Sequence, residues 1–209
     1  TVQKLGELQG MYCKYGQTAA GFTNTLGEKW IIELRKLENK VPPRSFECIR
    51  ETIESETGLK MEDIFETIDP EPLGSASIGQ VHMAVLKEKA AGTANSKKVA
   101  VKVQYPEAQA LFQGDMKTIR SMCEYLAPEQ LVILDAIEKQ NATELDYTNE
   151  EANLRTIHKN MKQHGFLPQQ VVVPKPIPLP LAPSKPPSTR VLVMELIPGQ
   201  KLIDGIHDY

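Results

Sequence analysis

The sequence predicts an α+β fold in which a helical N-terminal extension precedes an antiparallel sheet with inserted helices. Three observations indicate this fold. Apolar residues recur at helical spacing in the first third of the chain, strand-like runs follow at residues 80–86 and 99–103, and another returns at 189–195 after a long helical stretch. We therefore expect a helical segment over residues 1–68, a sheet-containing domain over 69–196 and a short remainder over 197–209.

The first third is predicted to hold four helices. Apolar spacing over residues 5–38 predicts two of them in tandem, with a break near Gly27. A third helix lies between Ser45, its expected N-cap, and Gly58, its expected C-cap. A short fourth helix is predicted over Met61–Ile68, because the Asp-Pro pair that follows is a helix stop.

Helical spacing resumes after Pro106 and predicts one long helix. Its apolar face consists of Ala108, Leu111, Phe112, Met116, Ile119, Met122 and Leu126. Two more helices are predicted, through residues 133–138 and from about 143 to 162, and then short strands at 170–173 and 189–195.

A proline-rich segment separates those last two strands. Residues 174–187 contain seven prolines, with P-x-x-P spacing at Pro180/Pro183 and Pro183/Pro186. Such a segment can dock in an aromatic-lined groove of a partner, or it can be an extended loop between two strands. We favour the loop.

Composition excludes several classes of function. The net charge of −3 and the pI near 5.9 give no overall attraction to nucleic acid, so we expect no nucleic-acid partner. Three scattered cysteines and four histidines show no metal-ligand spacing. The longest apolar run, residues 190–198, is too short to span a membrane, so membrane contact would be peripheral. Because Thr1 lies inside a predicted helix, the sequence gives no indication for or against a targeting segment.

A turn before the first predicted strand carries a phosphate-loop pattern. Kinase phosphate loops follow G-x-G-x-x-G-x-V, and this turn matches at the first glycine, the last glycine and the valine, with Ala76 in place of the middle glycine. Glycine lets backbone N–H groups approach phosphate oxygens and permits positive φ. An ordinary hairpin bend would give the same pattern. The candidate nucleotide-binding residues are Gly74, Ser75, Ala76, Ser77, Ile78, Gly79, Gln80 and Val81.

Lys102 ends the apolar strand Val99-Ala100-Val101-Lys102. In a kinase small lobe, a lysine on such a strand points its ammonium at the α- and β-phosphates of ATP. A lysine on a strand is usually a solvated charge, but a phosphate-loop pattern one strand earlier favours the nucleotide site.

The predicted helix over residues 143–162 begins with many carboxylates. Asp146 and Glu150 share a helix face at i, i+4 and would repel each other if unpaired. A solvated acidic face is one interpretation. The other is that one carboxylate holds Lys102 while others meet a second cation, for which Lys14 is the candidate.

The ordered set of motifs resembles the UbiB family of atypical protein-kinase-like proteins, also called aarF-domain or ADCK-type proteins. The motifs are K-x-G-Q from Lys14, P-x-x-x-A-S-x-x-Q-V-H around the turn, V-A-x-K ending at Lys102, and E-L-D from Glu144 with a glutamate downstream. The resemblance covers essentially the whole chain. It implies a protein-kinase-like small lobe, an antiparallel sheet with inserted helices, after a helical extension.

The resemblance also implies roles for individual residues. Lys14 and Gln17 match the K-x-G-Q motif, which lies across the protein-substrate cleft in this family. Lys102 resembles the phosphate-binding lysine and Glu150 the glutamate that pairs with it. Glu144 and Asp146 match the acidic motif that contacts the K-x-G-Q lysine. A last set, which resembles the hinge that binds adenine through its backbone, is Met194, Glu195 and Leu196.

Two departures from the family pattern concern these motifs. The family's alanine-rich loop reads Gly74-Ser75-Ala76 here, closer to an ordinary glycine-rich loop, and residues 18–21 lack the serine and arginine that often follow K-x-G-Q. No catalytic-loop aspartate or asparagine and no D-F-G aspartate occurs in the 209 residues. Since those groups hold Mg²⁺ and orient the acceptor, we expect this chain not to transfer phosphate by itself.

The resemblance leaves two functions open. The first is the ATP- or ADP-binding part of a kinase or ATPase that supports isoprenoid-quinone biosynthesis or lipid homeostasis in mitochondria, plastids or bacteria, with Mg²⁺ held by a large lobe. The second is a non-catalytic module that senses nucleotide and docks a lipid or a protein of quinone biosynthesis.

Overall fold

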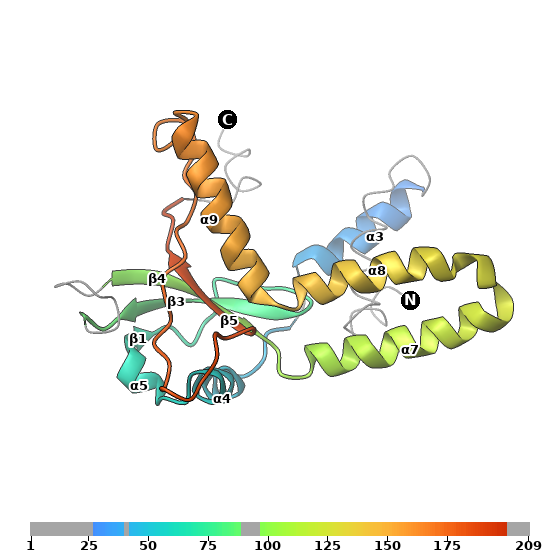
Figure 1. Ribbon diagram of the computed structural model, residues 1–209, viewed down its shortest axis with the longest axis horizontal. Coiled ribbons are helices and arrows are strands. Elements are labelled where there is room, and N and C mark those ends of the chain that lie inside the picture. Colours follow the sequence, from blue (N-terminus) through green and yellow to red (C-terminus); the bar gives the residue numbers. More distant parts are fainter. Residues whose placement is uncertain (1–26, 40–41, 89–96, 200–209) are drawn as a thin grey trace.

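The computed structural model describes residues 27–39, 42–88 and 97–199. Its centre is an antiparallel sheet, with helices α4 (Phe46–Thr57) and α5 (Met61–Ile64) against one face and helix α9 (Tyr147–Gln163) rising from the other. Helices α7 (Ala108–Leu126) and α8 (Leu131–Glu144) form a hairpin that projects sideways from the sheet, and α3 (Glu28–Asn39) lies beside it (Figure 1). The predicted α+β class is therefore confirmed.

Helix α4 has the boundaries that the sequence predicts. The Ser45 side chain accepts a hydrogen bond from the Cys48 amide at 3.3 Å, and Gly58 ends the helix with φ of 69°. That left-handed conformation favours glycine, which has no Cβ to collide with its own backbone. Helix α3 matches the second of the two tandem helices predicted over residues 5–38, and the first lies outside the described residues.

The helix predicted over Met61–Ile68 is wrong in its second half. Helix α5 ends at Ile64, and Phe65–Ile68 forms strand β1, which pairs with β3 through Phe65↔Leu86 and Ile68↔Ala84. Phe65 is buried in the sheet core, and Thr67 and Ile68 are β-branched. Pairing with β3 and burial thus decide that this half is a strand, and the Asp-Pro stop that follows fits the end of a strand as well as that of a helix.

The sheet has five antiparallel strands. They are β1, β2 (Gly74–Ser75), β3 (Gly79–Leu86), β4 (Lys97–Gln104) and β5 (Val191–Glu195). The order is β1-β3-β4-β5, with β2 paired to the start of β3. The central hairpin of β3 and β4 is in register from Gly79↔Gln104 to Leu86↔Lys97.

The two faces of β4 have different partners. Val99, Val101 and Val103 are fully buried and pack with Ile49 and Ile53 of α4. Because side chains alternate along a strand, Lys102 lies on the opposite face, where it pairs with Glu150 of α9. Helices α4 and α5 therefore share one core with the sheet, and the first turn of α9 meets the face that carries the lysine.

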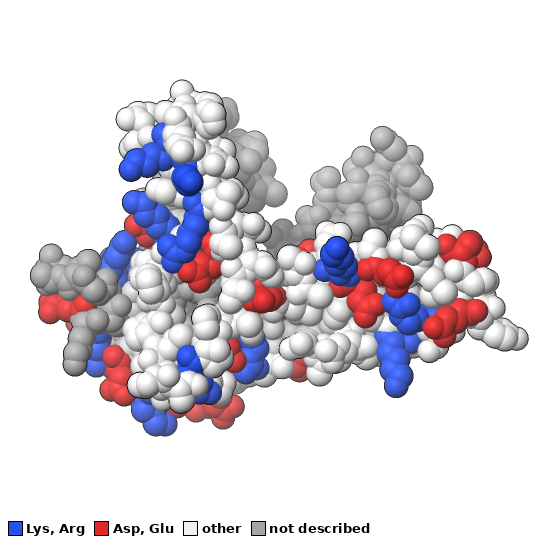
Figure 2. All heavy atoms as spheres, in the orientation of Figure 1, with Lys and Arg blue, Asp and Glu red and all other residues white. Residues whose placement is uncertain are grey.

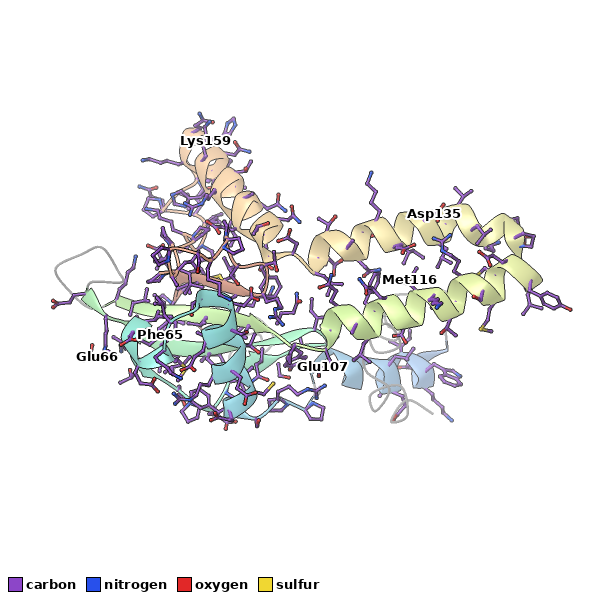
Figure 3. The ribbon with its side chains drawn as sticks, turned by 60° about the horizontal axis from the view of Figure 1, so that its bottom comes forward. Phe65, Glu66, Glu107, Met116, Asp135 and Lys159 are labelled. Atoms are coloured by element: carbon purple, nitrogen blue, oxygen red, sulfur yellow. The ribbon has the colours of Figure 1, made fainter. Side chains whose placement is uncertain are left out.

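The α7–α8 hairpin has a small core of its own. Phe112, Met116 and Leu134 are its buried residues, and Met116 lies between the two helices in Figure 3. Helix α8 runs from Leu131 to Glu144, well beyond the predicted 133–138, and a single turn of 3-10 helix joins it to α7. Figure 2 shows charges of both signs on this hairpin and mostly basic side chains along the upper part of α9. No helix in the described part of the chain is long and apolar enough to cross a membrane.

The strand predicted at residues 170–173 is wrong. The amides of Gln170 and Val171 both donate to the Phe166 carbonyl in a turn, and the following segment forms with β5 the isolated bridge Pro176↔Met194 rather than a ladder. Proline has no N–H group, so a segment with prolines at every second position from 174 cannot sustain a ladder.

The proline-rich segment is a loop that covers the core. The Ala182 amide donates to the Thr57 carbonyl at 2.8 Å, and the Lys185 ammonium donates to the Ser55 carbonyl. Ile177 and Leu179 pack against the buried sheet residues. These contacts fit the loop interpretation, since the segment is held along α4 and its apolar side chains face inward.

A buried polar network ties β3 to the loops around it. The Arg44 amide donates to Gln80 Oε1 at 2.8 Å, Gln80 Nε2 lies 2.8 Å from His82 Nε2, and His82 Nδ1 lies 2.7 Å from the Asp69 carbonyl. An amide nitrogen only donates and a carbonyl only accepts, so these partners assign His82 the neutral tautomer with its proton on Nδ1. The Q-V-H motif therefore has a structural role here.

This network predicts a loss of stability in mild acid. Burial lowers the pKa of His82 below its ordinary 6.5, so below that pH the unfolded chain binds a proton before the native chain does. The free energy of unfolding should therefore fall as the pH drops from 7.5 to 5.5, by at most about 1.4 kcal/mol per pH unit from this one group. Urea unfolding of the wild type and of His82→Gln at both pH values measures the effect.

The His82→Gln variant should lose most of this pH dependence, whereas His164→Gln, at an exposed turn, should keep it. Equal pH dependence in the wild type and His82→Gln would show that the neutral His82 tautomer does not stabilise the fold.

Candidate functional site

The structure brings Lys102 and Glu150 together. Lys102 comes from β4 and Glu150 from the first turn of α9, and Lys102 Nζ lies 2.6 Å from Glu150 Oε2. The two side chains are 27% and 38% exposed, so the pair is reachable from solvent. The predicted ion pair is thus present, while its part in binding nucleotide stays a prediction.

Asp146 fixes where α9 begins. Its carboxylate accepts hydrogen bonds from the Thr148 amide at 2.9 Å and from the Thr148 hydroxyl at 2.6 Å, as an N-cap does. The cap determines that Glu150 falls in the first turn, on the side facing β4. Lys14 and Gln17, the predicted partners of the acidic motif, lie outside the described residues.

Tyr147 lies beneath the lysine and was not predicted. Its ring centroid is 4.6 Å from Lys102 Nζ, its side chain is almost fully buried, and its amide donates to the Thr189 carbonyl. Burial, and next the Glu150 carboxylate, raise the pKa of the Tyr147 hydroxyl, so it stays protonated. The helical spacing could have revealed this residue, because positions 147 and 150 share a helix face.

A cavity of about 250 Å³ opens beside the lysine. Its lining includes one ammonium, three carboxylates and several neutral hydrogen-bonding groups. The lining residues are Ile78, Lys102, Thr143, Glu144, Asp146, Asn149, Glu150 and Asn153. Thr143, Asn149 and Asn153 had no part in the predicted site. With three carboxylates, this cavity favours a ligand that brings positive charge along with any phosphate.

The candidate phosphate turn is a tight hairpin. The Ala76 amide donates to the Gly79 carbonyl at 2.8 Å, and Gly74 and Ser75 pair with Val81 and Gln80. Ala76 N–H is therefore already used within the turn. Ser77 and Ile78 form the tip, and Ile78 is the turn residue that lines the cavity.

The glycines of this turn are not explained by backbone conformation. Neither Gly74 nor Gly79 has a positive φ, so that part of the sequence argument is wrong. A Cβ on Gly79 would lie 2.5 Å from the Val103 carbonyl oxygen and 2.8 Å from Tyr147 Oη, whereas one on Gly74 would meet nothing within 4 Å. Close packing against β4 and α9 therefore requires glycine at position 79 only.

Two other turn residues use their side chains for structure. Gln80 belongs to the polar network on the α4 face, opposite to Lys102, so a contact between its side chain and nucleotide is not supported. Ser75 Oγ lies 3.1 Å from Tyr105 Oη, and Tyr105 stacks under the Arg44 guanidinium at 4.9 Å. Both contacts hold the turn against the end of β4.

The residues predicted as a hinge lie at the end of β5. Met194 pairs with Ala100, which puts its side chain on the lysine's face of the sheet, two positions from Leu192, the partner of Lys102. The Glu195 carboxylate accepts from Lys97 at 2.9 Å, and the Glu195 amide donates to the Lys175 carbonyl. Met194, Glu195 and Leu196 are not among the residues that line the described cavity beside Lys102, and their part in binding adenine stays a prediction.

A family model supports the resemblance seen in the sequence. The ABC1 atypical kinase-like domain matches residues 36–207. Helices α4, α5, α7, α8 and α9 and the described sheet lie in that range.

Similar proteins come from plants, animals and bacteria. Protein ACTIVITY OF BC1 COMPLEX KINASE 8, chloroplastic, of Arabidopsis thaliana is 30% identical over 201 residues, which cover 91% of this chain and 24% of that protein. AarF domain-containing protein kinase 1 of Mus musculus is 29% identical, with 94% and 35% covered. Probable protein kinase UbiB of Shewanella woodyi is 30% identical, with 95% and 35% covered. The chain thus spans a quarter to about a third of the length of these relatives.

A solved structure has the same fold. The complex of Rv3197 with erythromycin from Mycobacterium tuberculosis matches with a TM-score of 0.61 and 28% identity, over 97% of this chain and 49% of that one. The match spans nearly all of this chain and about half of the other.

Proposed function

The chain belongs to the ABC1 atypical kinase-like family, and from this premise we propose that it is the ATP-binding portion of a UbiB-type kinase or ATPase. One observation carries the proposal. A strand-borne lysine is held 2.6 Å from a helix carboxylate beside a cavity that the β2–β3 turn also lines. A carboxylate partner orients the ammonium, as phosphate binding by this lysine requires.

We propose that the turn and the lysine share the phosphates. The amides of Ser77 and Ile78 at the tip of the turn are the candidate backbone donors, and Lys102 supplies the charge. Adenine would lie toward Met194 at the end of β5. When nucleotide binds, the Lys102 ammonium would donate hydrogen bonds to phosphate oxygens as well as to Glu150.

Mg²⁺ belongs to the proposal through the nucleotide. In the described part of the chain no group of three or more His, Cys, Asp or Glu side chains is placed to hold a metal ion. We therefore assign no metal ligand and no step to a metal within those residues. Mg·ATP is the ligand that fits best, because the magnesium ion lowers the negative charge that would face Glu144, Asp146 and Glu150.

The biological role is proposed from the relatives. UbiB-type proteins are linked to isoprenoid-quinone biosynthesis, and we propose that this chain supports the synthesis of ubiquinone or plastoquinone, or lipid homeostasis. Several similar proteins are described as chloroplastic, and we propose a plastid or mitochondrial location for the protein to which this chain belongs. Turnover and substrate are properties of that whole protein.

The test is whether the chain binds nucleotide. Mg·ATP at about 100 times its dissociation constant should stabilise the native chain by about 2.7 kcal/mol, and each kcal/mol raises the Tm of a chain of this size by about 2–4 °C. Thermal unfolding with Mg·ATP, Mg·ADP or Mg·tripolyphosphate separates adenine from phosphate recognition. No shift with any of the three up to 10 mM, which is 100 times a dissociation constant of about 100 μM, would contradict the proposal.

A separate expectation concerns Lys14. If it meets the acidic motif, Lys14→Ala should change the rate of ATP hydrolysis or autophosphorylation in the whole protein without lowering its Tm. Lys4→Ala, elsewhere in the same segment, is the matched control. Unchanged rates in Lys14→Ala would remove Lys14 from the proposed site.

A further inference from the structure

Tyr147 lies where the three parts of the candidate site meet. It is the first residue of α9, its ring contacts the Lys102 ammonium from β4, and its hydroxyl lies against Gly79 of the turn. The side chain is 1% exposed. Any movement of α9 relative to the sheet must therefore carry this ring with it.

The ring and Glu150 both contact the ammonium. Lys102 Nζ is 2.6 Å from Glu150 Oε2 and 4.6 Å from the centroid of the Tyr147 ring. A cation within about 6 Å of an aromatic face is attracted by the ring quadrupole, and more strongly where water is partly excluded. Leucine would fill similar space but would give no such attraction.

The hydroxyl has a different part. Tyr147 Oη is buried and has no hydrogen-bond partner in the described part of the chain. It would lie only 2.8 Å from a Cβ at position 79. Its role is therefore spacing, because the missing side chain of Gly79 is what leaves room for it.

We propose that Tyr147 is a positioning residue. Its ring orients the Lys102 ammonium, and its hydroxyl fills the space that the absent side chain of Gly79 leaves. The inference rests on the proposed nucleotide site for its purpose, but the contact it describes exists without nucleotide. The far end of α9, marked by Lys159 in Figure 3, lies away from the sheet, so the first turn with Tyr147 is the part of α9 closest to the lysine.

The experiment is acylation of lysines by acetic anhydride, without nucleotide, followed by peptide mass spectrometry. Lys97 is the internal reference, since it also lies on β4 and is also paired with a carboxylate, that of Glu195. In Tyr147→Leu the rate at Lys102 relative to Lys97 should rise about 3- to 10-fold. In Tyr147→Phe, which keeps the ring, it should stay within about twofold.

Two results would overturn the inference. One is an unchanged ratio in Tyr147→Leu, and the other is the same rise in Tyr147→Phe as in Tyr147→Leu. A measurement on the wild type covers the case in which Tyr147→Leu does not fold. The ε-methylene protons of Lys102 should show an upfield ring-current shift in NMR spectra, and ordinary lysine shifts would equally overturn the inference.

A nucleotide titration separates this inference from the proposed function. The Mg·ATP affinity should fall about 3- to 10-fold in Tyr147→Leu and stay within about twofold in Tyr147→Phe. If the wild type binds no nucleotide, the proposed function fails while the acylation result still decides the role of the ring.

Discussion

Replacement of Lys102 by alanine is expected to weaken Mg·ATP binding about 10- to 100-fold, the largest effect of any single substitution. A hydrogen bond to a charged group contributes about 1.5–3 kcal/mol, and 1.4 kcal/mol is a factor of ten in affinity. The variant also leaves Glu150 beside the cavity without its cation, which adds repulsion toward phosphate. Isothermal titration calorimetry measures the affinity directly.

Lys97→Ala is the matched control for this variant. It removes an ammonium from the same strand and breaks a comparable ion pair, with Glu195 at 2.9 Å, outside the cavity. Its affinity for Mg·ATP should stay within about twofold of the wild type, because a partly exposed ion pair contributes about 1 kcal/mol or less. Equal losses in both variants would show that general charge, rather than the position of Lys102, governs binding.

Gly79→Ala is expected to destabilise the fold by about 1–3 kcal/mol, as overpacking of a closed site does. The new Cβ would lie 2.5 Å from the backbone oxygen of Val103, which can move only if the β3–β4 hairpin opens. Gly74→Ala should change the free energy of unfolding by about 0.5 kcal/mol or less, since nothing lies within 4 Å and φ is not positive. Urea unfolding of the two variants measures the difference.

The double variant Gly79→Ala/Tyr147→Phe refines this prediction. Loss of the Tyr147 hydroxyl removes the 2.8 Å contact but leaves the one with Val103, so the stability lost in Gly79→Ala should be recovered only in part. If Gly74→Ala proved as damaging as Gly79→Ala, close packing would not be the reason for glycine in this turn.

The central hairpin could be predicted because its local signals agree with its environment. The runs at 80–86 and 99–103 are rich in valine, and the observed strands Gly79–Leu86 and Lys97–Gln104 contain both. The caps at Ser45 and Gly58 could also be predicted, since the first depends on one side chain and the second on one backbone conformation.

The two wrong elements depended on partners that the sequence does not reveal. Residues 65–68 are short enough to be helix or strand, and the edge of β3 decides between them. Residues 170–173 have strand-forming valines, but the turn at Phe166 and the prolines that follow prevent a ladder.

The charged residues of the candidate site could be predicted from the sequence, and the contacts that depend on close packing could not. Lys102 and Glu150 could be paired from their motifs, and the ion pair is present. Helical spacing places Tyr147 on the face of Glu150, but it does not reveal the contact of the ring with Lys102 or the steric role of Gly79. Both follow from how closely α9 and the hairpin approach each other. Gln80 was predicted to bind nucleotide from its motif. The alternation of side chains along β3 instead puts it on the opposite face, in the buried polar network.

Protection of Lys102 by nucleotide tests the central claim most directly. The wild-type chain is acylated with and without saturating Mg·ATP, and the modification of Lys102 is compared with that of Lys97 by peptide mass spectrometry. We predict that Mg·ATP slows acylation of Lys102 at least about tenfold, the factor that 1.4 kcal/mol of contact with phosphate provides, and leaves Lys97 unchanged. Equal modification of Lys102 with and without Mg·ATP would contradict the nucleotide site.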